Sequence, residues 1–431
     1  MRMRFAHLRF VRTTALAIAV SAALSSAALA HAPHAGSGGV DQAPAQALAI
    51  GALLDLTGSG ATLGKSSQAA LNLAALDINA ELQSVGSSLN VQVTVRDTGL
   101  TPATALQASQ ELASEGVQVA IGPQTSSEVA AIQLWANANG FLIVSHGSTA
   151  SSLSNRNDNV LRFVPDDTHE IEAVSALLKR DGIKAVVPLW RDDAGNRGLH
   201  DSLVRLFPAD GGVVLDGASY PANASDYSAP LATVSTQLQQ AQQEYGAGSV
   251  AIMLASFEEA VQVFHAAQRV PVLAGARWYG TDGVAQSAAL LQDAQAMAFA
   301  TQVVFPCANL GLDPEAKGDW QPLSDRIMAS TGIAPDASAL AAYDAAWVIT
   351  LAYLETGPAP QAAALRQAIV NTAGHYYGAT AQTMLNASGD RASGDYDFWS
   401  IRSQGGSPKW VVTATYQAGL GGSGTITEAG R

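Results

Sequence analysis

Small hydroxyl-bearing residues follow two short apolar runs, and they are well placed to hold a ligand at the edge of a sheet. Ser126 comes after the run 119–121, and Thr149 comes after the run 141–144. Each run predicts a short strand that ends in a polar loop. If a crossover helix joins two parallel strands, both loops lie at the same carboxyl edge, where open α/β folds bind ligands. The spacing therefore predicts that Ser126 and Thr149 face one crevice.

A helix is expected between the two loops. Thr125 and Glu128 have the spacing of a capping box with Thr125 as the N-cap, so the helix N-terminus points toward the first loop. A simpler interpretation stays open. Thr125 and Ser126 could only cap this helix, and Ser148 and Thr149 could only complete a turn.

An enzymatic interpretation, a weak serine hydrolase, pairs Ser126 with His146 from the adjacent loop. No Gly-x-Ser-x-Gly elbow, Walker loop or His-Glu-x-x-His motif occurs, so we predict no catalytic residue and no cofactor. Because Cys307 is the single cysteine, the chain cannot form an intramolecular disulfide. Cys307 is expected to be a small buried residue. The eight histidines show no zinc spacing, and no metal site is predicted.

Hydrophobic periodicity predicts an alternation of strands and helices that starts near residue 50. Four strands and three helices up to residue 153 predict a parallel, doubly wound lobe. The pattern restarts after a crossing near residues 161–165. The second set has strands at 185–189, 213–218, 250–254 and 276–280, with helices at 170–179, 198–206, 231–243 and 258–268.

The chain is then expected to cross between lobes twice more. It returns near Thr301 with a strand at 302–305 and a helix at 339–354, and it recrosses near 386–391 before strands at 398–402 and 410–415. The predicted fold is α/β, with two doubly wound parallel-sheet lobes joined by a three-crossing hinge. The N-terminal lobe takes residues 47–165 plus 300–388, and the C-terminal lobe takes 166–299 plus 389–431. The cleft between them is the expected site.

The segment from Ile121 to Thr149 resembles a known family. Its order is strand, Gly, small polar loop with a Ser, helix, strand, and a Ser-x-x-x-Thr loop in which His146 replaces the usual Pro. The runs 50–58 (IGALLDLTG) and 77–80 (DINA) extend the likeness, which covers nearly all of the mature chain. The chain resembles the branched-chain amino-acid-binding proteins, the leucine/isoleucine/valine branch of the type I periplasmic binding proteins.

The resemblance implies roles for particular residues. Ser126, the backbone of Gly147, and Thr149 match the positions that hold a ligand carboxylate in this family. Asp282, in the run WYGTDG, matches the acidic residue that holds the ligand ammonium. Asp282 before Gly could equally be a turn residue.

The pocket wall departs from the family pattern at one position. Gly195 stands where the family often has Tyr. We expect Trp190 to fill that space, unless the ligand is larger or differently shaped than leucine. Phe257 stands at the position of a second aromatic residue that lines the cleft in this family. Leu63, in the first loop, is expected to line the pocket for the ligand side chain.

The N-terminus predicts export. Four arginines precede an apolar run 14–29 that ends in Ala-Leu-Ala, so residues 1–30 are predicted to be a cleavable signal peptide. Residues 31–46, rich in Ala, Gly and Pro, are predicted to be a disordered leader. No later run is expected to be long and apolar enough to span a membrane. Loss of the four arginines takes the formal charge from −13 to −17, which disfavours nucleic acid and anionic membranes as partners.

These features together predict a periplasmic, monomeric solute receptor. Its expected partners are an amino acid or a related amide and a membrane ABC permease. A sensory or scaffold receptor of the same fold without a transport role is the alternative that the sequence leaves open.

Overall fold

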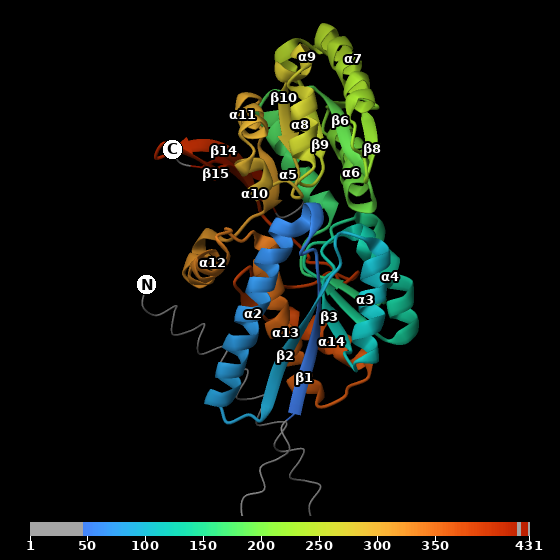
Figure 1. The fold of residues 1–431 in the computed structure, drawn as a ribbon, viewed down its shortest axis with the longest axis vertical. Coiled ribbons are helices and arrows are strands. Elements are labelled where there is room, and N and C mark those ends of the chain that lie inside the picture. Colours follow the sequence, from blue (N-terminus) through green and yellow to red (C-terminus); the bar gives the residue numbers. More distant parts are fainter. Residues whose placement is uncertain (1–45, 420–423, 430–431) are drawn as a thin grey trace, which may run out of the picture.

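The computed structural model describes residues 46–419 and 424–429, which form two lobes stacked along the long axis of the molecule (Figure 1). The first lobe is built on a five-stranded, wholly parallel sheet with the order β2-β1-β3-β4-β5. Its strands are β1 (Gln46–Leu54), β2 (Leu89–Asp97), β3 (Val119–Ile121), β4 (Leu142–Ser145) and β5 (Val160–Arg162).

Helices cover both faces of this sheet. Two separate apolar clusters lie on its opposite faces because side chains alternate along each strand: Leu54 belongs to one cluster and Leu53 to the other. The helices of this lobe are α2 (Ala61–Ser84), α3 (Pro102–Ser114), α4 (Ser126–Asn139), α12 (Lys317–Thr331), α13 (Ala337–Thr356) and α14 (Ala362–Ala373). The prediction of a parallel, doubly wound lobe is confirmed, and the sheet has a fifth strand, β5.

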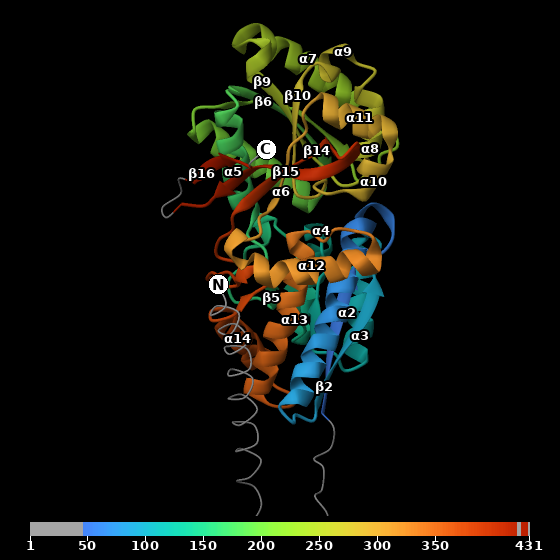
Figure 2. The same cartoon turned by 90° about the vertical axis from the view of Figure 1, so that its left-hand side faces the viewer.

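The second lobe is built on a nine-stranded sheet with the order β16-β15-β14-β11-β10-β9-β6-β7, and β8 also pairs with β6. Its strands are β6 (Ala185–Asp192), β7 (Val213–Val214), β8 (Ala218–Pro221), β9 (Val250–Ala255), β10 (Arg277–Gly280), β11 (Cys307–Leu310), β14 (Tyr396–Gln404), β15 (Ser407–Gln417) and β16 (Thr425–Glu428). Its helices are α5 (Asp167–Arg180), α6 (Ala194–Ala209), α7 (Ser228–Tyr245), α8 (Ala260–Ala267), α9 (Pro271–Ala274), α10 (Ala288–Gln292) and α11 (Ala294–Gln302). Strands β14 to β16 extend the parallel part with antiparallel pairs (Figure 2).

The chain crosses between the two sheets three times. The crossings follow β5, follow β11 and precede β14, and the short hairpin β12 (Tyr377–Gly378) and β13 (Ala381–Gln382) lies before the last one. The predicted fold class is therefore confirmed, including its three-crossing connection.

The strand predicted at 302–305 in the first lobe is wrong. Asp293 caps α11 by accepting hydrogen bonds from the backbone of Gln295 and Ala296, and the helix then runs through Gln302. The chain reverses at Val304, where φ is +50°, and the strand forms only at β11. β11 pairs with β10 and β14, so it belongs to the second sheet. The other lobe boundaries stay predictions.

Helix α13 corrects a second expectation. By length and composition it could cross a membrane, although no run after the signal peptide is expected to be long and apolar enough for that. It lies instead inside the first lobe, where 83% of its apolar window is buried, chiefly against α2 and α14. The expected signal peptide and nearly all of the expected leader lie outside the described residues, and β1 begins at Gln46.

Candidate functional site

A cavity of about 40 Å³ lies where the two lobes meet. Most of its lining comes from the N-terminal turns of helices and from loops at the carboxyl ends of strands in both sheets, as expected for an open α/β fold. The lining residues are Leu63, Gln124, Thr125, Ser126, Gly147, Thr149, Gly195, Asn196, Leu199, Phe257, Asp282, Gly283, Asn309, Asp336 and Ser338.

Six of the seven residues expected at the site line this one cavity. They come from segments far apart in the chain: Leu63, Ser126, Gly147, Thr149, Phe257 and Asp282. Trp190 is not among the lining residues. Its ring stacks on His200 of α6, with the centroids 3.9 Å apart, so it packs within the second lobe and leaves the space beside Gly195 to the cavity.

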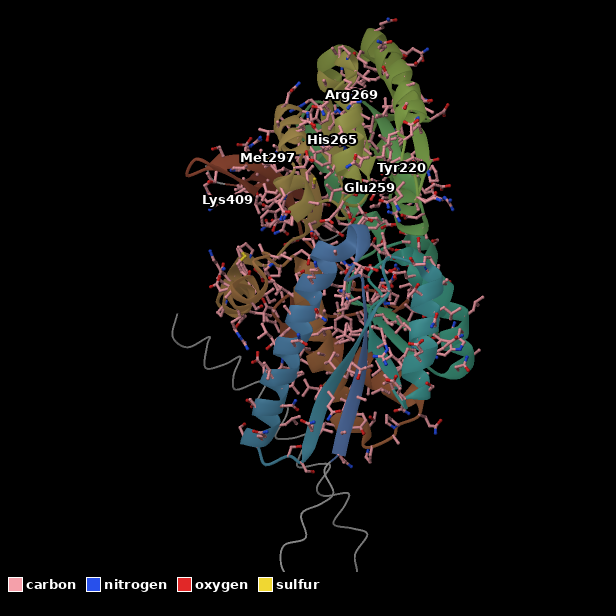
Figure 3. The ribbon with its side chains drawn as sticks, viewed as in Figure 1. Tyr220, Glu259, His265, Arg269, Met297 and Lys409 are labelled. Atoms are coloured by element: carbon pink, nitrogen blue, oxygen red, sulfur yellow. The ribbon has the colours of Figure 1, made fainter. Side chains whose placement is uncertain are left out.

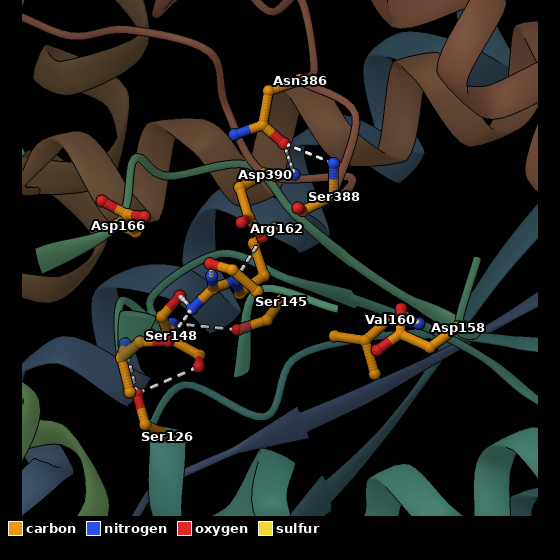
Figure 4. A network of polar contacts seen from close by, with 12 residues as sticks. Ser126, Ser145, Ser148, Asp158, Val160, Arg162, Asp166, Asn386, Ser388 and Asp390 are labelled. Atoms are coloured by element: carbon orange, nitrogen blue, oxygen red, sulfur yellow. Dashed lines mark hydrogen bonds and ion pairs between the residues drawn. The ribbon is translucent and has the colours of Figure 1, made fainter. Parts of the chain in front are cut away.

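A hydroxyl network fixes the first-lobe wall. The Ser126 Oγ accepts a hydrogen bond from the Ala150 backbone at 3.0 Å and lies 3.0 Å from the Ser148 Oγ (Figure 4). The Ser145 hydroxyl donates to the Pro123 carbonyl at 2.6 Å and accepts from the Ser148 backbone. These bonds tie the loop after β4 to the start of α4, so the two predicted loops do lie together.

The start of α4 differs from the predicted capping box. Thr125 is the N-cap, but its hydroxyl donates to the Glu128 carboxyl at 2.5 Å and caps no backbone N–H. Burial, with the nearby Asp55 carboxyl, raises the pKa of Glu128 well above its ordinary value. Because no side chain caps α4, its first N–H groups are available to an anion at the cavity wall.

Asp282 forms part of the opposite wall, just after β10. Its backbone N–H donates to the buried Glu170 Oε1 at 3.1 Å. Burial raises the pKa of Asp282, and the Asp336 carboxylate raises it further. Burial, followed by the charge on Asp282, raises the pKa of Glu170 well above its usual range.

Phe257 is held in place from behind. Its backbone N–H and the Tyr220 hydroxyl both lie 3.2 Å from the Glu259 Oε1, which accepts from each. The Arg191 guanidinium lies 3.4 Å from the other Glu259 oxygen and 5.2 Å above the Phe257 ring. Figure 3 shows Tyr220 and Glu259 side by side in the second lobe. Phe257 is therefore a fixed apolar surface of the cavity.

Sequence reasoning missed Asp336, Asn309 and Gln124. Asp336 is the N-cap of α13, and its Oδ1 accepts from the Ala339 backbone at 2.8 Å. Burial raises the pKa of Asp336 to about 6. An Asp directly before a long apolar helix is a recognisable N-cap signal, but only the chain crossing brings this cap to the cavity.

The geometry does not form the hydrolase pair. His146 is fully buried, its Nε2 lies 3.1 Å from the Ser67 Oγ, and burial lowers its pKa to about 4. Ser126 instead bonds to Ser148 and Ala150. Among the described residues, no group of three His, Cys, Asp or Glu side chains is arranged to hold a metal ion.

Comparison with known proteins identifies the family and the fold. The chain is 28% identical over 389 residues to the uncharacterized protein MJ1266 of Methanocaldococcus jannaschii, which covers 86% of this chain and 90% of the relative. The isoleucine complex of the substrate-binding protein LivJ from Streptococcus pneumoniae superposes with a TM-score of 0.65 at 18% identity, covering 85% of this chain and all of that one.

A periplasmic binding protein type 1 from Bordetella pertussis gives a TM-score of 0.70 at 17% identity, with the same coverage of both chains. At these identities the solved structures show the fold, that of the type I periplasmic binding proteins. The family described as "Receptor family ligand binding region" matches residues 66–404. The chain therefore belongs to that receptor family.

Proposed function

We propose that this protein is an exported solute receptor that closes its two lobes on an α-amino acid or a related amide and delivers it to a membrane ABC permease. The observation that carries the proposal is that Asp282 shares one interlobe cavity with Ser126 and Thr149. Ser126 and Thr149 offer hydroxyl donors from the first lobe, and Asp282 offers a carboxylate from the second.

The first-lobe wall suits a ligand carboxylate. Ser126 and Thr149 offer hydroxyl groups, Gly147 offers its backbone, and the uncapped start of α4 offers N–H groups. A helix N-terminus adds about 0.3 to 1 kcal/mol for an anion. A Cβ on Gly147 would lie 2.8 Å from the Gln124 carbonyl oxygen, so this close approach requires glycine.

Asp282 suits the ligand ammonium. A carboxylate in this position can be neutralised by an ammonium, and charge-assisted hydrogen bonds contribute about 1.5 to 3 kcal/mol each. Several such bonds offset the entropy of association and leave the roughly 8 kcal/mol of micromolar binding. Leu63, Leu199 and Phe257 supply apolar contacts for the rest of the ligand.

Closure follows from the placement of the two walls. A ligand that contacts both lobes binds the closed form better than the open one and shifts the population toward it. The three chain crossings permit such a hinge motion. The export signal expected at residues 1–30 and the monomeric state are part of the same proposal.

The test is a thermal-shift screen of residues 31–431 against amino acids, their amides and short amides, followed by calorimetry. A ligand at a hundredfold its Kd adds about 2.7 kcal/mol and raises the Tm by a few degrees. We expect Asp282→Asn to lose amino-acid binding with an unchanged far-UV spectrum, whereas Asp325→Asn on the exposed face of α12 keeps it. Unchanged affinity in Asp282→Asn would refute the assignment.

A further inference from the structure

We propose that Asp336 binds a second cationic group on the ligand, so that the receptor selects dibasic α-amino acids over neutral ones of the same shape. The inference rests on the proposed function, because it assumes that Asp282 and the first-lobe wall hold the α-amino and α-carboxylate groups. It adds the class of side chain, which the comparisons do not assign.

The charge balance of the cavity is the first observation. Asp282 and Asp336 both line it, and none of the described residues in its lining is a lysine, arginine or histidine. The buried guanidinium of Arg191, which lies 5.2 Å above the Phe257 ring, is paired with Asp193 and Glu259, and that of Arg162 is paired with Asp390 at 2.5 Å. A neutral α-amino acid brings one ammonium and one carboxylate, so it leaves the two acidic groups with a single new cation. A second cation on the side chain supplies the missing counter-charge.

The carboxylates stand at different places in the fold. Asp282 follows β10 in the second lobe, whereas Asp336 opens α13 in the first. Asp336 is 5% exposed, and only its Oδ1 is used as the helix cap. A carboxylate has two oxygens and about four acceptor sites, so Asp336 retains capacity for a ligand donor.

Two further polar groups point to a ligand. The Gln124 Oε1 is buried at the cavity wall and accepts no hydrogen bond from the residues that the structure describes. The Asn309 Nδ2, on a side chain that is 2% exposed, makes no well-formed hydrogen bond within this part of the chain, although the Asn309 amide lies close enough to the Asp336 carboxyl to oppose the rise of its pKa. Leaving such buried groups unpaired costs about 1 to 3 kcal/mol each, so a bound polar group that pairs with them is favoured.

An organic cation fits better than a metal ion. Among residues 46–419 and 424–429, no three His, Cys, Asp or Glu side chains converge as metal ligands. The lining also includes Leu63, Leu199 and Phe257, which suit the methylene groups between two ammonium groups.

The capping role of Asp336 can be separated from the proposed one. Asparagine caps helices about as well as aspartate, so Asp336→Asn keeps the bond to Ala339 and removes only the charge. Asp293 gives a matched control, since it is an N-cap aspartate outside the cavity lining. Asp293→Asn changes a helix cap outside the site, together with the contact that Asp293 makes with His265.

Ornithine and norleucine are the test ligands, because their side chains have the same number of heavy atoms and differ in the terminal ammonium. Arginine and citrulline form a second pair of this kind. Calorimetry at pH 7.5 on residues 31–431 is expected to show at least a tenfold preference for one or both cationic members. In Asp336→Asn the preference should fall below threefold, with the affinity for the neutral member unchanged within threefold. Asp293→Asn should behave as the unchanged chain.

The outcomes separate this inference from the proposed function. If norleucine and citrulline both bind as tightly as their cationic partners, the inference is overturned and the proposed function stands. A preference that persists in Asp336→Asn also overturns it. If none of the four amino acids binds and a wider amino-acid screen is negative, the proposed function fails, and the inference fails with it.

Discussion

Arg162 and Asp390 form a buried ion pair that joins the first chain crossing to the third, with Nε and Oδ1 2.5 Å apart (Figure 4). Neither side chain is more than 2% exposed. Arg162 Nη1 also donates to the Ala150 carbonyl at 2.8 Å, beside the cavity residue Thr149. The backbones pair as well, since Arg162 donates to the Gly389 carbonyl at 2.8 Å. The pair therefore braces the hinge against one wall of the cavity.

Removing one partner of this pair should destabilise the fold strongly. Asp390→Ala leaves the Arg162 guanidinium buried without its counter-ion, and we expect a loss of about 3 to 5 kcal/mol in the free energy of unfolding. Lys179→Ala is the control, because Lys179 and Asp210 form an exposed pair whose loss should cost less than about 1 kcal/mol. Urea titration measures both. A loss below 1 kcal/mol in Asp390→Ala would show that the pair does not brace the hinge.

Thr149 and Ser126 should matter for the ligand carboxylate and not for the ammonium. Thr149→Val and Ser126→Ala are expected to weaken amino-acid binding about tenfold or more, since each removes a donor to a charged group. The affinity for the corresponding decarboxylated amine should fall much less in both variants. Calorimetry with each amino acid and its decarboxylated amine checks this division. Equal losses for both ligand types would contradict it.

The first lobe could be predicted from the sequence because its strands are short apolar runs with polar loops directly after them. The run 119–121 is a strand with the predicted bounds, and the helix that follows starts one residue after the predicted N-cap. Local pattern decides such elements. The same pattern brought Ser126 and Thr149 to one cavity, because parallel strands end at one edge.

Contacts between distant segments could not be predicted in this way. Arg162 and Asp390 are 228 residues apart, and their pairing depends on the path of the third crossing. Asp336 reaches the cavity because the N-terminus of α13, which it caps, lies there. The apolar run 302–305 was mistaken for a strand because its first residue is still helical and Val304 turns the chain. Trp190 was misplaced because the sequence does not show that its ring stacks on His200.

Stability should fall with rising pH because of Asp167. Burial raises the pKa of Asp167 to about 7, although the Thr149 hydroxyl opposes this; the carboxylates of Asp282 and Asp166 add to the shift and Arg162 reduces it. The unfolded chain has the ordinary aspartate pKa of about 3.9, so the folded state binds more protons between about pH 4 and pH 7. The free energy of unfolding therefore decreases as the pH rises through this window.

Asp167→Asn should remove part of this slope. Three pKa units correspond to on the order of 4 kcal/mol, which is an upper bound for one group. The rest of the pH dependence comes from other buried carboxyls with raised pKa values, among them Glu170 and Asp336, and is the same in the unchanged chain and in Asp167→Asn. Urea titrations at pH 5 and pH 8 measure the difference. The same slope in both proteins would show that Asp167 does not titrate in this range.

Gly195 should control how much room the ligand has. A Cβ at this position would lie 3.6 Å from the Ser126 Oγ and 3.7 Å from the Asp193 Oδ1, which are ordinary contacts. Gly195→Ala should therefore fold normally, with stability unchanged or raised by less than about 1 kcal/mol, because Gly195 lies in the first turn of α6. Gly195→Tyr adds a ring where the cavity is, since Trp190 leaves that space open. We expect at least a tenfold loss of affinity in Gly195→Tyr, with a Tm within a few degrees of that of Gly195→Ala. If both variants bind equally well in calorimetry, the ligand does not occupy the space beside Gly195.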